Sequence, residues 1–310
     1  MTARLRRVAH RLHHGLRAGV VAATALLLLA TSAAVAAGRW ATAPLDGADP
    51  YVLLVIGSDK GPPRDDTVLE GNADAQHLLV VSPDRQHASI LTFPRDTWVD
   101  MVGRGRKAKI NSDMKEGGGI EPQVASIEQL VGLEVDDWIV TGFNSFDNAI
   151  DELGGVTIDV ERRLRDPRGA ASDLQPGVQT LRGYDTLAYS RDRNSRPNGD
   201  LGRVRAHANV LVDLHAQLFA ADLDLAETVR HVDILRRHTV SSMPPQRMLQ
   251  LAGLALEIDP ANVHQQTLPA RLGTVGNQSV VLMTGGADAV FADLRDDGIL
   301  NDADSNPFNG

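Results

Sequence analysis

The stretch Tyr51–Asp59, YVLLVIGSD, decides the fold class of this chain. Its first part, Tyr51–Ile56, is a continuous apolar run, which predicts a buried strand rather than one that alternates between core and solvent. Gly57 and Ser58 end the run, and Asp59 follows directly. Because a buried strand needs other elements packed over it, the stretch favours a domain in which helices cover a mostly buried sheet.

Strands and helices alternate along the rest of the chain without an internal repeat. Further strands are predicted at 76–81, 88–93, 138–140, 156–160, 263–268 and 279–282. Helices are predicted at 122–131, 145–153, 183–190, 201–219, 223–235 and 244–258. Ser145 is the expected N-cap of the second helix, and Gly154 with Gly155 its stop. This order predicts a single α/β (α+β) domain of three layers, with a central mixed sheet flanked by helices.

The first forty residues differ from the rest, with six arginines and no acidic residue. Ala18–Ala37 is an uncharged run of twenty residues, long enough as a helix to span a bilayer core of ~30 Å. The arginines before it mark that side as cytoplasmic. A cleaved secretory signal with Ala34 and Ala36 at its cleavage site is the alternative. The full spanning length favours a retained anchor, and both interpretations place the residues after about 40 outside the cytoplasm.

The predicted organisation has five parts. They are a cytoplasmic basic segment at 1–17, a transmembrane helix at 18–38, a linker at 39–50, a globular domain at 51–290 and an acidic, frayed tail at 291–310.

Charge and composition exclude several classes of function. The first forty residues hold six of the 31 basic residues, so 25 bases face 40 acids over 41–310, a net charge of −15. Such a surface repels duplex nucleic acid, so no nucleic-acid partner is expected. The chain has no cysteine, which excludes disulfides, thiolate catalysis and cysteine-based zinc sites. The sequence also lacks a G-x-x-x-x-G-K phosphate loop and an H-E-x-x-H zinc motif.

An arginine cluster lies at Arg191–Arg205, RDRNSRPNGDLGRVR, in this otherwise acidic chain. Its basic residues are Arg191, Arg193, Arg196, Arg203 and Arg205. Each guanidinium is a planar fork that matches two phosphate oxygens at once. Several forks in one short segment suggest a site for a multiply charged anion, with pyrophosphate as the leading candidate. A solvated basic face on a loop and helix is the alternative.

Two aspartates are candidate metal ligands. Asp59 follows a buried strand directly, and Asp74 precedes the next strand. If these strands are neighbours, both carboxylates can reach one Mg²⁺, which takes its other ligands from water and substrate phosphates. Asp65 and Asp66 compete as ligands from the same loop, and a turn aspartate beside a loop acid is the plainer interpretation.

Two more cations lie near predicted strand ends. Arg95 follows the strand at 88–93, and Lys109 lies in a basic loop just before Asn111. Each alone is an ordinary surface charge. Together with Arg191, Arg193 and Arg203 they form a possible clamp for a diphosphate, of the kind that stabilises charge in phosphoryl transfer.

These residues, in this order, resemble the LytR-CpsA-Psr family from about Tyr51 to Leu214. The matching segments are Leu53–Asp59, Asn72–Ala75, Phe93–Thr97, Lys109–Asn111, Gly117–Gly119, Glu152–Val156, Ala188–Arg193 and Asp200–Arg203. Any one segment is weak, but their common order makes chance agreement improbable.

The resemblance implies a membrane-anchored, single-pass phosphotransferase with its catalytic domain outside the cytoplasm. Such proteins move an anionic glycopolymer from a polyprenyl-pyrophosphate carrier to the C6 hydroxyl of N-acetylmuramic acid in peptidoglycan. The resemblance implies Mg²⁺, with Mn²⁺ as an alternative, held by Asp59 and Asp74. It assigns the pyrophosphate to Arg95, Arg191, Arg193 and Arg203, and further substrate contacts to Lys109 and Asn111. It also implies an apolar tunnel for the lipid between sheet and helices.

The chain departs from the family pattern at both ends of the site. Asn72 stands where the family has an arginine, and Arg64, earlier in the loop, is a candidate substitute that contacts substrate. A competing alignment takes Arg64–Thr67 as the motif, with Asp66 as the metal ligand. Asp74 is preferred because nine residues separate it from Pro83, as the family's strand requires.

The second departure follows Arg203. The family has another arginine and then glutamines, whereas this chain has Ala206, His207, Ala208 and Asn209. His207 lies four residues after Arg203, on the same helix face. It is expected to hydrogen-bond a phosphate, more strongly when protonated.

Four hypotheses for function follow. The first is the transferase, and the second is a polyprenyl-pyrophosphate hydrolase that uses water as acceptor. The third is a non-catalytic binder of envelope lipid or polymer. The fourth, a transcription regulator, disagrees with the membrane segment and the charge of −15 over 41–310. The polymer is open among teichoic acid, arabinogalactan and capsule. The excess of arginine over lysine fits a high-GC, actinobacterial genome and tilts toward an arabinogalactan-like polymer.

Overall fold

The computed structural model describes residues 49–301 except 61–64 and 198. The predicted cytoplasmic segment, transmembrane helix and most of the linker lie outside the described residues, as does Arg64. Among the residues that the structure does describe, no helix is long and apolar enough to span a bilayer.

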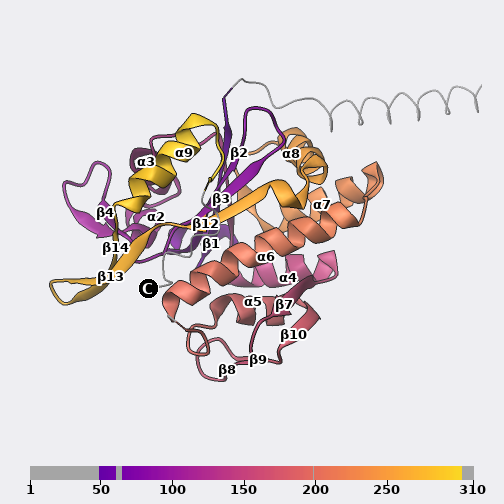
Figure 1. The fold of residues 1–310 in the computed structure, drawn as a ribbon, viewed down its shortest axis with the longest axis horizontal. Helices are drawn as coiled ribbons and strands as arrows, with labels where there is room; N and C mark the ends of the chain where they lie inside the picture. The colour runs from indigo at the N-terminus through magenta and orange to yellow at the C-terminus, as the bar shows by residue number, and fades with distance from the viewer. Residues whose placement is uncertain (1–48, 61–64, 198, 302–310) are drawn as a thin grey trace, which may run out of the picture. The chain divides into compact units, whose positions relative to one another are not determined.

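A mixed six-stranded sheet forms the centre of the domain (Figure 1). Its strand order is β11 (Val240–Ser241), β6 (Asp137–Thr141), β1 (Tyr51–Ser58), β2 (Ala73–Val81), β3 (Ala88–Thr92) and β12 (Val263–Thr267). β1 pairs parallel with β6 and antiparallel with β2, and β12 is parallel to β3. The predicted mixed sheet is therefore confirmed, with β1 near its middle.

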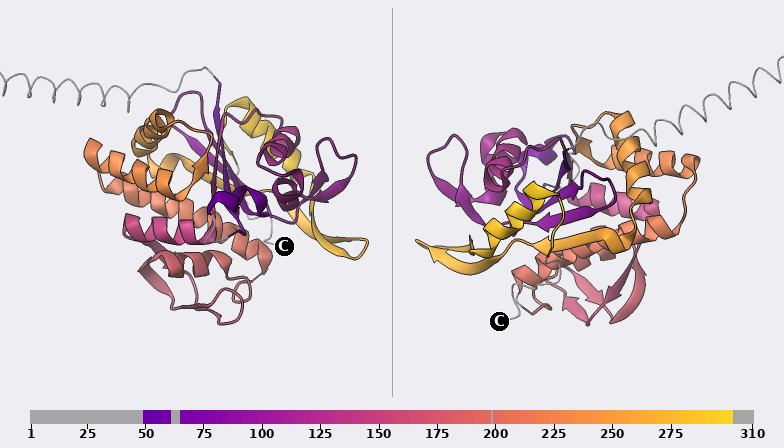
Figure 2. Two further views of the ribbon diagram at one scale, coloured as in Figure 1. Left: turned by 180° about the vertical axis from the view of Figure 1, so that it is seen from behind. Right: turned by 45° about the horizontal axis from the view of Figure 1, so that its top comes forward.

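Strand β1 packs side chains into a different core on each face of the sheet. Val52, Leu54 and Ile56 belong to a core covered by α2 (Asp113–Gly117), α3 (Glu121–Val131) and α9 (Gly286–Asp296). Tyr51 and Leu53 belong to the opposite core, which includes residues of α7 (Leu225–His238) and α8 (Pro245–Glu257). The helices thus lie on both faces of the sheet (Figure 2). This two-sided burial is why the β1 sequence is apolar at consecutive positions.

A third core lies beside the sheet. It is formed by α4 (Phe143–Leu153), α5 (Gly183–Arg191), the first half of α6 (Asp200–Ala220) and strand β7 (Val156–Val160). β7 was predicted as a strand, but it pairs with β10 (Gly177–Leu181) outside the central sheet. Short strands β8 (Leu164–Asp166) and β9 (Ser172–Leu174) pair below it.

The start of α4 differs from the prediction. Its N-cap is Gly142, not Ser145, which is buried in the first turn of the helix. A Cβ at position 142 would lie 2.6 Å from the carbonyl oxygen of Lys60, so the close approach of the loop requires glycine there. The predicted stop is confirmed, because Gly154 ends the helix in the left-handed region at φ 95°.

Two hairpins extend from the body in Figure 1. Strands β4 (Trp98–Asp100) and β5 (Lys107–Lys109) form the first, and β5 lies in the segment before Asn111 that was predicted as a basic loop. Strands β13 (Ala270–Val275) and β14 (Gln278–Met283) form the second.

The predicted boundary between domain and tail at 290 is wrong. Helix α9 runs to Asp296, and Phe291, Leu294 and Leu300 are buried in the main core. The acids of this segment alternate with apolar residues at helical spacing, so the acids face solvent while the apolar side chains pack. Its acidic composition therefore concealed an amphipathic helix.

Replacing Leu294 with alanine tests this correction. Leu294 is fully buried, and such a truncation lowers the free energy of unfolding by about 2–5 kcal/mol. Leu272→Ala is the matched control, because Leu272 is 59% exposed on the β13–β14 hairpin and its loss should change stability by less than about 0.5 kcal/mol. Urea denaturation of both variants measures the difference. Equal stability of the two variants would mean that α9 does not contribute to the core.

Candidate active site

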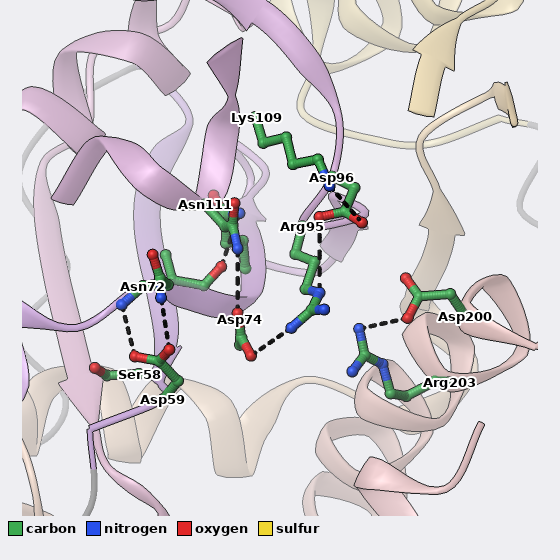
Figure 3. A network of polar contacts seen from close by, with 12 residues as sticks. Ser58, Asp59, Asn72, Asp74, Arg95, Asp96, Lys109, Asn111, Asp200 and Arg203 are labelled. Atoms are coloured by element: carbon green, nitrogen blue, oxygen red, sulfur yellow. Dashed lines mark hydrogen bonds and ion pairs between the residues drawn. The ribbon is translucent and has the colours of Figure 1, made fainter. Parts of the chain in front are cut away.

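The two predicted metal ligands lie at the same end of two paired strands. Asp59 follows the end of β1, and Asp74 is the second residue of β2, which pairs with β1. A register shift between Gly57 and Ser58 marks this end of the pair, and Asp59 N donates to the carbonyl oxygen of Asn72 at 3.0 Å. Figure 3 shows both carboxylates, with Asp59 bound to Asn72 and, separately, Asp74 bound to Arg95 and Asn111.

Asn72 fixes the carboxylate of Asp59. Its backbone N and its Nδ2 donate to the two oxygens of Asp59 at 2.7 and 2.6 Å. The turn closes so tightly that a Cβ on Gly71 would lie 2.1 Å from Ser58 Oγ, so only glycine fits there. The residue that replaces the family arginine therefore orients the first aspartate.

Asp74 connects Arg95 and Asn111. Arg95 Nη1 forms an ion pair with Asp74 Oδ2 at 2.7 Å, and Asn111 Nδ2 donates to Asp74 Oδ1 at 3.2 Å. Lys109 instead pairs with Asp96 at 3.2 Å, and Arg95 Nε lies 3.8 Å from that same carboxylate. The structure therefore brings four predicted site residues, Asp74, Arg95, Lys109 and Asn111, into one network, in which Asp96 is an additional member.

Arg203 approaches Arg95 from α6. It lies in the first turn of the helix, only 8% exposed, with Nη2 2.7 Å from Asp200 Oδ1. Figure 3 shows the guanidinium groups of Arg95 and Arg203 pointing toward one another. Within the described part of the chain, the Nε atoms of both arginines are buried without a hydrogen-bond partner. Buried donors of this kind are costly unless a ligand satisfies them, which indicates an anion site.

The pKa directions of the two arginines differ. Burial lowers the pKa of Arg203, Asp200 opposes the change, and nearby Arg95 adds to it. Burial alone would also lower the pKa of Arg95, but Asp74, Asp96 and Asp200 outweigh it, so the net direction is upward. Burial therefore disfavours the charged form of Arg203, and a bound anion would stabilise it.

The other four arginines of the cluster fall into two groups. Arg191 and Arg193 are exposed and form no ion pair with any residue that the structure describes. The Arg191 guanidinium lies over the Phe143 ring, 4.7 Å from its centroid, and the charge of Arg193 acts on Arg203. Their contact with a pyrophosphate stays a prediction. Arg196 instead donates to backbone carbonyls, and Arg205 is exposed.

His207 does not have the role that the sequence suggested. Its Nε2 lies 2.8 Å from the carbonyl oxygen of Ser190, and because a carbonyl only accepts, Nε2 carries the proton. Burial, with contributions from nearby His77 and Arg203, holds the pKa of His207 well below its usual value. The ring is therefore neutral, and its single N–H is used within the protein rather than on a phosphate.

Sequence reasoning missed Asp96 and Asp200, the counter-ions of the basic residues. Asp200 stands three positions before Arg203 at the start of the same helix, a spacing at which opposite charges meet. That spacing was a usable signal. Asp96 pairs with Lys109 across the β4–β5 region and had no comparable signal.

The donor set fits a magnesium ion that is shared with a phosphate ligand. Among the described residues, no group of three or more His, Cys, Asp or Glu side chains is arranged to hold a metal. Asp59 and Asp74 instead provide two carboxylates at one strand end. Mg²⁺ commonly takes one or two carboxylates and completes its shell with water and substrate phosphates. The pair therefore suits a metal–diphosphate complex rather than a cage of protein ligands.

Comparison with known proteins decides the family. The model of the LytR_cpsA_psr family matches residues 30–295, most of the chain. The chain belongs to the LytR_cpsA_psr family.

Two relatives are named as teichoic acid transferases. The chain is 31% identical over 167 residues to the polyisoprenyl-teichoic acid–peptidoglycan teichoic acid transferase TagU of Bacillus licheniformis, covering 54% of this chain and 52% of that protein. It is 29% identical over 171 residues to the transferase TagT of Bacillus subtilis, covering 53% and 52%. The chain thus spans about half the length of the curated relatives that it matches.

Solved structures of the family share the fold. The crystal structure of B. subtilis TagV aligns with a TM-score of 0.68 at 20% identity, covering 81% of this chain and 96% of that one. TagT bound to LIIa-WTA aligns with a TM-score of 0.66 at 21% identity, covering 81% and 92%.

One departure from the family pattern has a structural explanation. Ala206, where the family has a second arginine, is 1% exposed and packs with Ile150 and Val210 in the core beside α5. A small apolar side chain fits this position, so in this family member it contributes to packing.

Proposed function

We propose that this chain is a phosphotransferase that moves an anionic glycopolymer from a polyprenyl-pyrophosphate carrier to peptidoglycan. The observation that carries the proposal is the pair Arg95 and Arg203, whose buried Nε atoms lack hydrogen-bond partners in the described structure beside the carboxylate of Asp74. Family membership and the similarity to the transferases TagU and TagT support it. We place the catalytic domain outside the cytoplasm, tethered to the membrane by residues 18–38.

The arginines supply the main electrostatic stabilisation in this proposal. The oxygen of an acceptor hydroxyl, the C6 hydroxyl of a muramic acid residue, attacks the phosphorus that carries the sugar. A new phosphorus–oxygen bond forms, the bond to the bridging oxygen breaks, and polyprenyl phosphate leaves with its electron pair. Arg95 and Arg203 donate to the phosphate oxygens on which charge develops. Arg191 and Arg193 add positive charge at the open side of the site.

Two carboxylates have a separate role. Mg²⁺, or Mn²⁺, held by Asp59 and Asp74 would neutralise the diphosphate. One carboxylate of the pair takes the proton from the acceptor hydroxyl, so that the hydroxyl attacks as a stronger nucleophile. Asn72 and Asn111 keep the two side chains in place through the hydrogen bonds described above.

A product analysis tests the proposal. The full chain in detergent is incubated with Mg²⁺ and a polyprenyl-pyrophosphate-linked saccharide, with and without peptidoglycan fragments, and products are identified by mass spectrometry. We expect a phosphodiester-linked saccharide on the peptidoglycan, formed only when the acceptor is present. Release of saccharide phosphate at the same rate without acceptor would support a hydrolase, and binding without turnover would support a non-catalytic binder. Donors with teichoic-acid, capsular and arabinogalactan-like saccharides rank the polymers.

A further inference from the structure

The C-terminal end of α5 is capped by one backbone N–H and by two side chains, those of Arg196 and His207. The last carbonyls of a helix have no partner within it. Here Asp192 N donates to the Ala188 carbonyl at 3.0 Å, and Arg196 Nη2 donates to that of Tyr189 at 3.0 Å. His207 Nε2 donates to the carbonyl of Ser190 at 2.8 Å. Three consecutive carbonyls are therefore satisfied just where the chain turns toward the arginines.

The segment that follows α5 is held equally firmly. The Arg196 guanidinium lies 4.5 Å from the centroid of the Tyr189 ring and donates through Nε to the Asp192 carbonyl. The buried carboxylate of Asp192 accepts from Ser172 Oγ at 2.6 Å and from Ser195 N at 2.9 Å. Arg191 and Arg193 are the sequence neighbours of Asp192. The hydrogen bonds of Asp192 therefore fix the backbone from which the two arginine side chains extend.

His207 connects this cap to Arg203, the buried arginine of the site. It lies on α6 four residues after Arg203, on the same helix face. The two rings of His207 and His77, on β2, meet edge to face at 6.0 Å, which holds His207 against the central sheet. One helix thus carries Arg203 directly and, through His207, holds the end of α5.

We propose that His207 is a positioning residue, which holds Arg191 and Arg193 at the pyrophosphate site by donating its Nε2–H to the Ser190 carbonyl. The inference rests on the proposed function and assigns this residue a role within that site. A neutral imidazole with its proton on Nε2 has no second N–H for a phosphate. The residue therefore acts through the arginines and not on the substrate.

The position of Nε2 determines which replacements of His207 keep the hydrogen bond to Ser190 and which lose it. The amide nitrogen of glutamine can take nearly the place of Nε2, whereas the shorter asparagine places its amide near the position of Nδ1. His207→Gln should therefore keep the bond to Ser190, and His207→Asn and His207→Leu should lose it.

Binding of farnesyl pyrophosphate with Mg²⁺ to the full chain in detergent, measured by calorimetry, tests the inference. We expect His207→Leu and His207→Asn to weaken binding about 5- to 10-fold, the effect of one lost hydrogen bond, and His207→Gln to stay within about 3-fold. In an Arg191→Ala, Arg193→Ala background, His207→Leu should have no further effect, because the groups that it positions are gone. Thermal unfolding of each variant shows whether it is folded.

The outcomes separate the two proposals. If the wild-type chain binds no pyrophosphate, the proposed function fails and the inference with it. If the wild type binds but His207→Leu weakens binding equally in both backgrounds, the residue has only a structural role and the inference alone is overturned. Equal losses for His207→Gln and His207→Asn overturn it too, and this comparison decides the matter if the leucine variant does not fold.

Discussion

Replacing Arg203 with alanine is expected to reduce glycopolymer transfer by at least about 100-fold while the chain stays folded. Removal of a single preorganised donor from a transition-state site typically costs about 10²- to 10³-fold in rate, and an arginine at a transferring phosphoryl group often contributes more. Arg203 fits this role because its side chain is buried and its Nε has no hydrogen-bond partner in the described structure. The loss should appear in kcat/KM measured with the lipid-linked donor.

Arg205→Ala is the matched control. The two arginines are two positions apart on α6, but Arg205 is exposed and Arg203 is buried, so only one faces the site. We expect the Arg205 variant to keep its activity within about 2-fold. Equal activities of the two variants would contradict the assignment of Arg203 to the anion site.

The Arg203→Ala substitution is expected to lower activity without lowering stability. The partly unsatisfied, buried guanidinium is unfavourable in the empty site, as the downward pKa direction of Arg203 indicates. Without it, Asp200 stays at the N-terminus of α6, where a carboxylate is favourable. The Arg203→Ala variant should therefore unfold at a temperature equal to or above that of the wild type, which separates a lost function from a lost fold.

The fold was predictable where a pattern extends over enough residues. The apolar run of β1 predicted a strand packed on both sides, and its side chains do enter two cores. β11 spans only Val240–Ser241 and carries no pattern, because its place is set by pairing with β6. Ser145 is a good N-cap residue by propensity, but the close contact at Gly142 starts the helix earlier. Tertiary contacts decided these two elements.

For the site, the positions of residues were predictable from the sequence, but their hydrogen-bond partners were not. The positions of Asp59, Asp74 and Arg95 at strand ends predicted that they lie at one edge of the sheet, because neighbouring strands bring their ends together. No sequence spacing indicates which atom a side chain will donate to. His207 shares a helix face with Arg203, as expected, yet its Nε2 is used by Ser190, which comes from a different helix. Likewise, the position of Ala206 in a hydrophobic core depends on β7 and α4 packing against α6.

Charge removal at the two aspartates should raise the Mg²⁺ requirement of the reaction. We expect Asp59→Asn and Asp74→Asn to lower transfer by about 100-fold at a fixed Mg²⁺ concentration, and to recover part of it as the concentration rises. The physical reason is that a carboxylate provides a charged oxygen ligand, whereas an amide binds Mg²⁺ far more weakly. Asp74→Asn should lose more, because it also removes the charge that holds Arg95 at 2.7 Å. Rates measured across a Mg²⁺ titration give the concentration for half-maximal activity.

Two comparison variants make this test specific. Arg95→Ala should lower the maximal rate without changing the Mg²⁺ concentration for half-maximal activity. The substitution removes a hydrogen-bond donor to the phosphate and not a metal ligand. Asp66→Asn changes the competing candidate, which lies in the 3₁₀ helix η1 (Asp65–Glu70), and should leave the titration unchanged. The opposite pattern, with Asp66→Asn raising the Mg²⁺ requirement and Asp74→Asn leaving it unaltered, would move the metal to the loop. In that case Asp74 would serve only to orient Arg95, as its ion pair already allows.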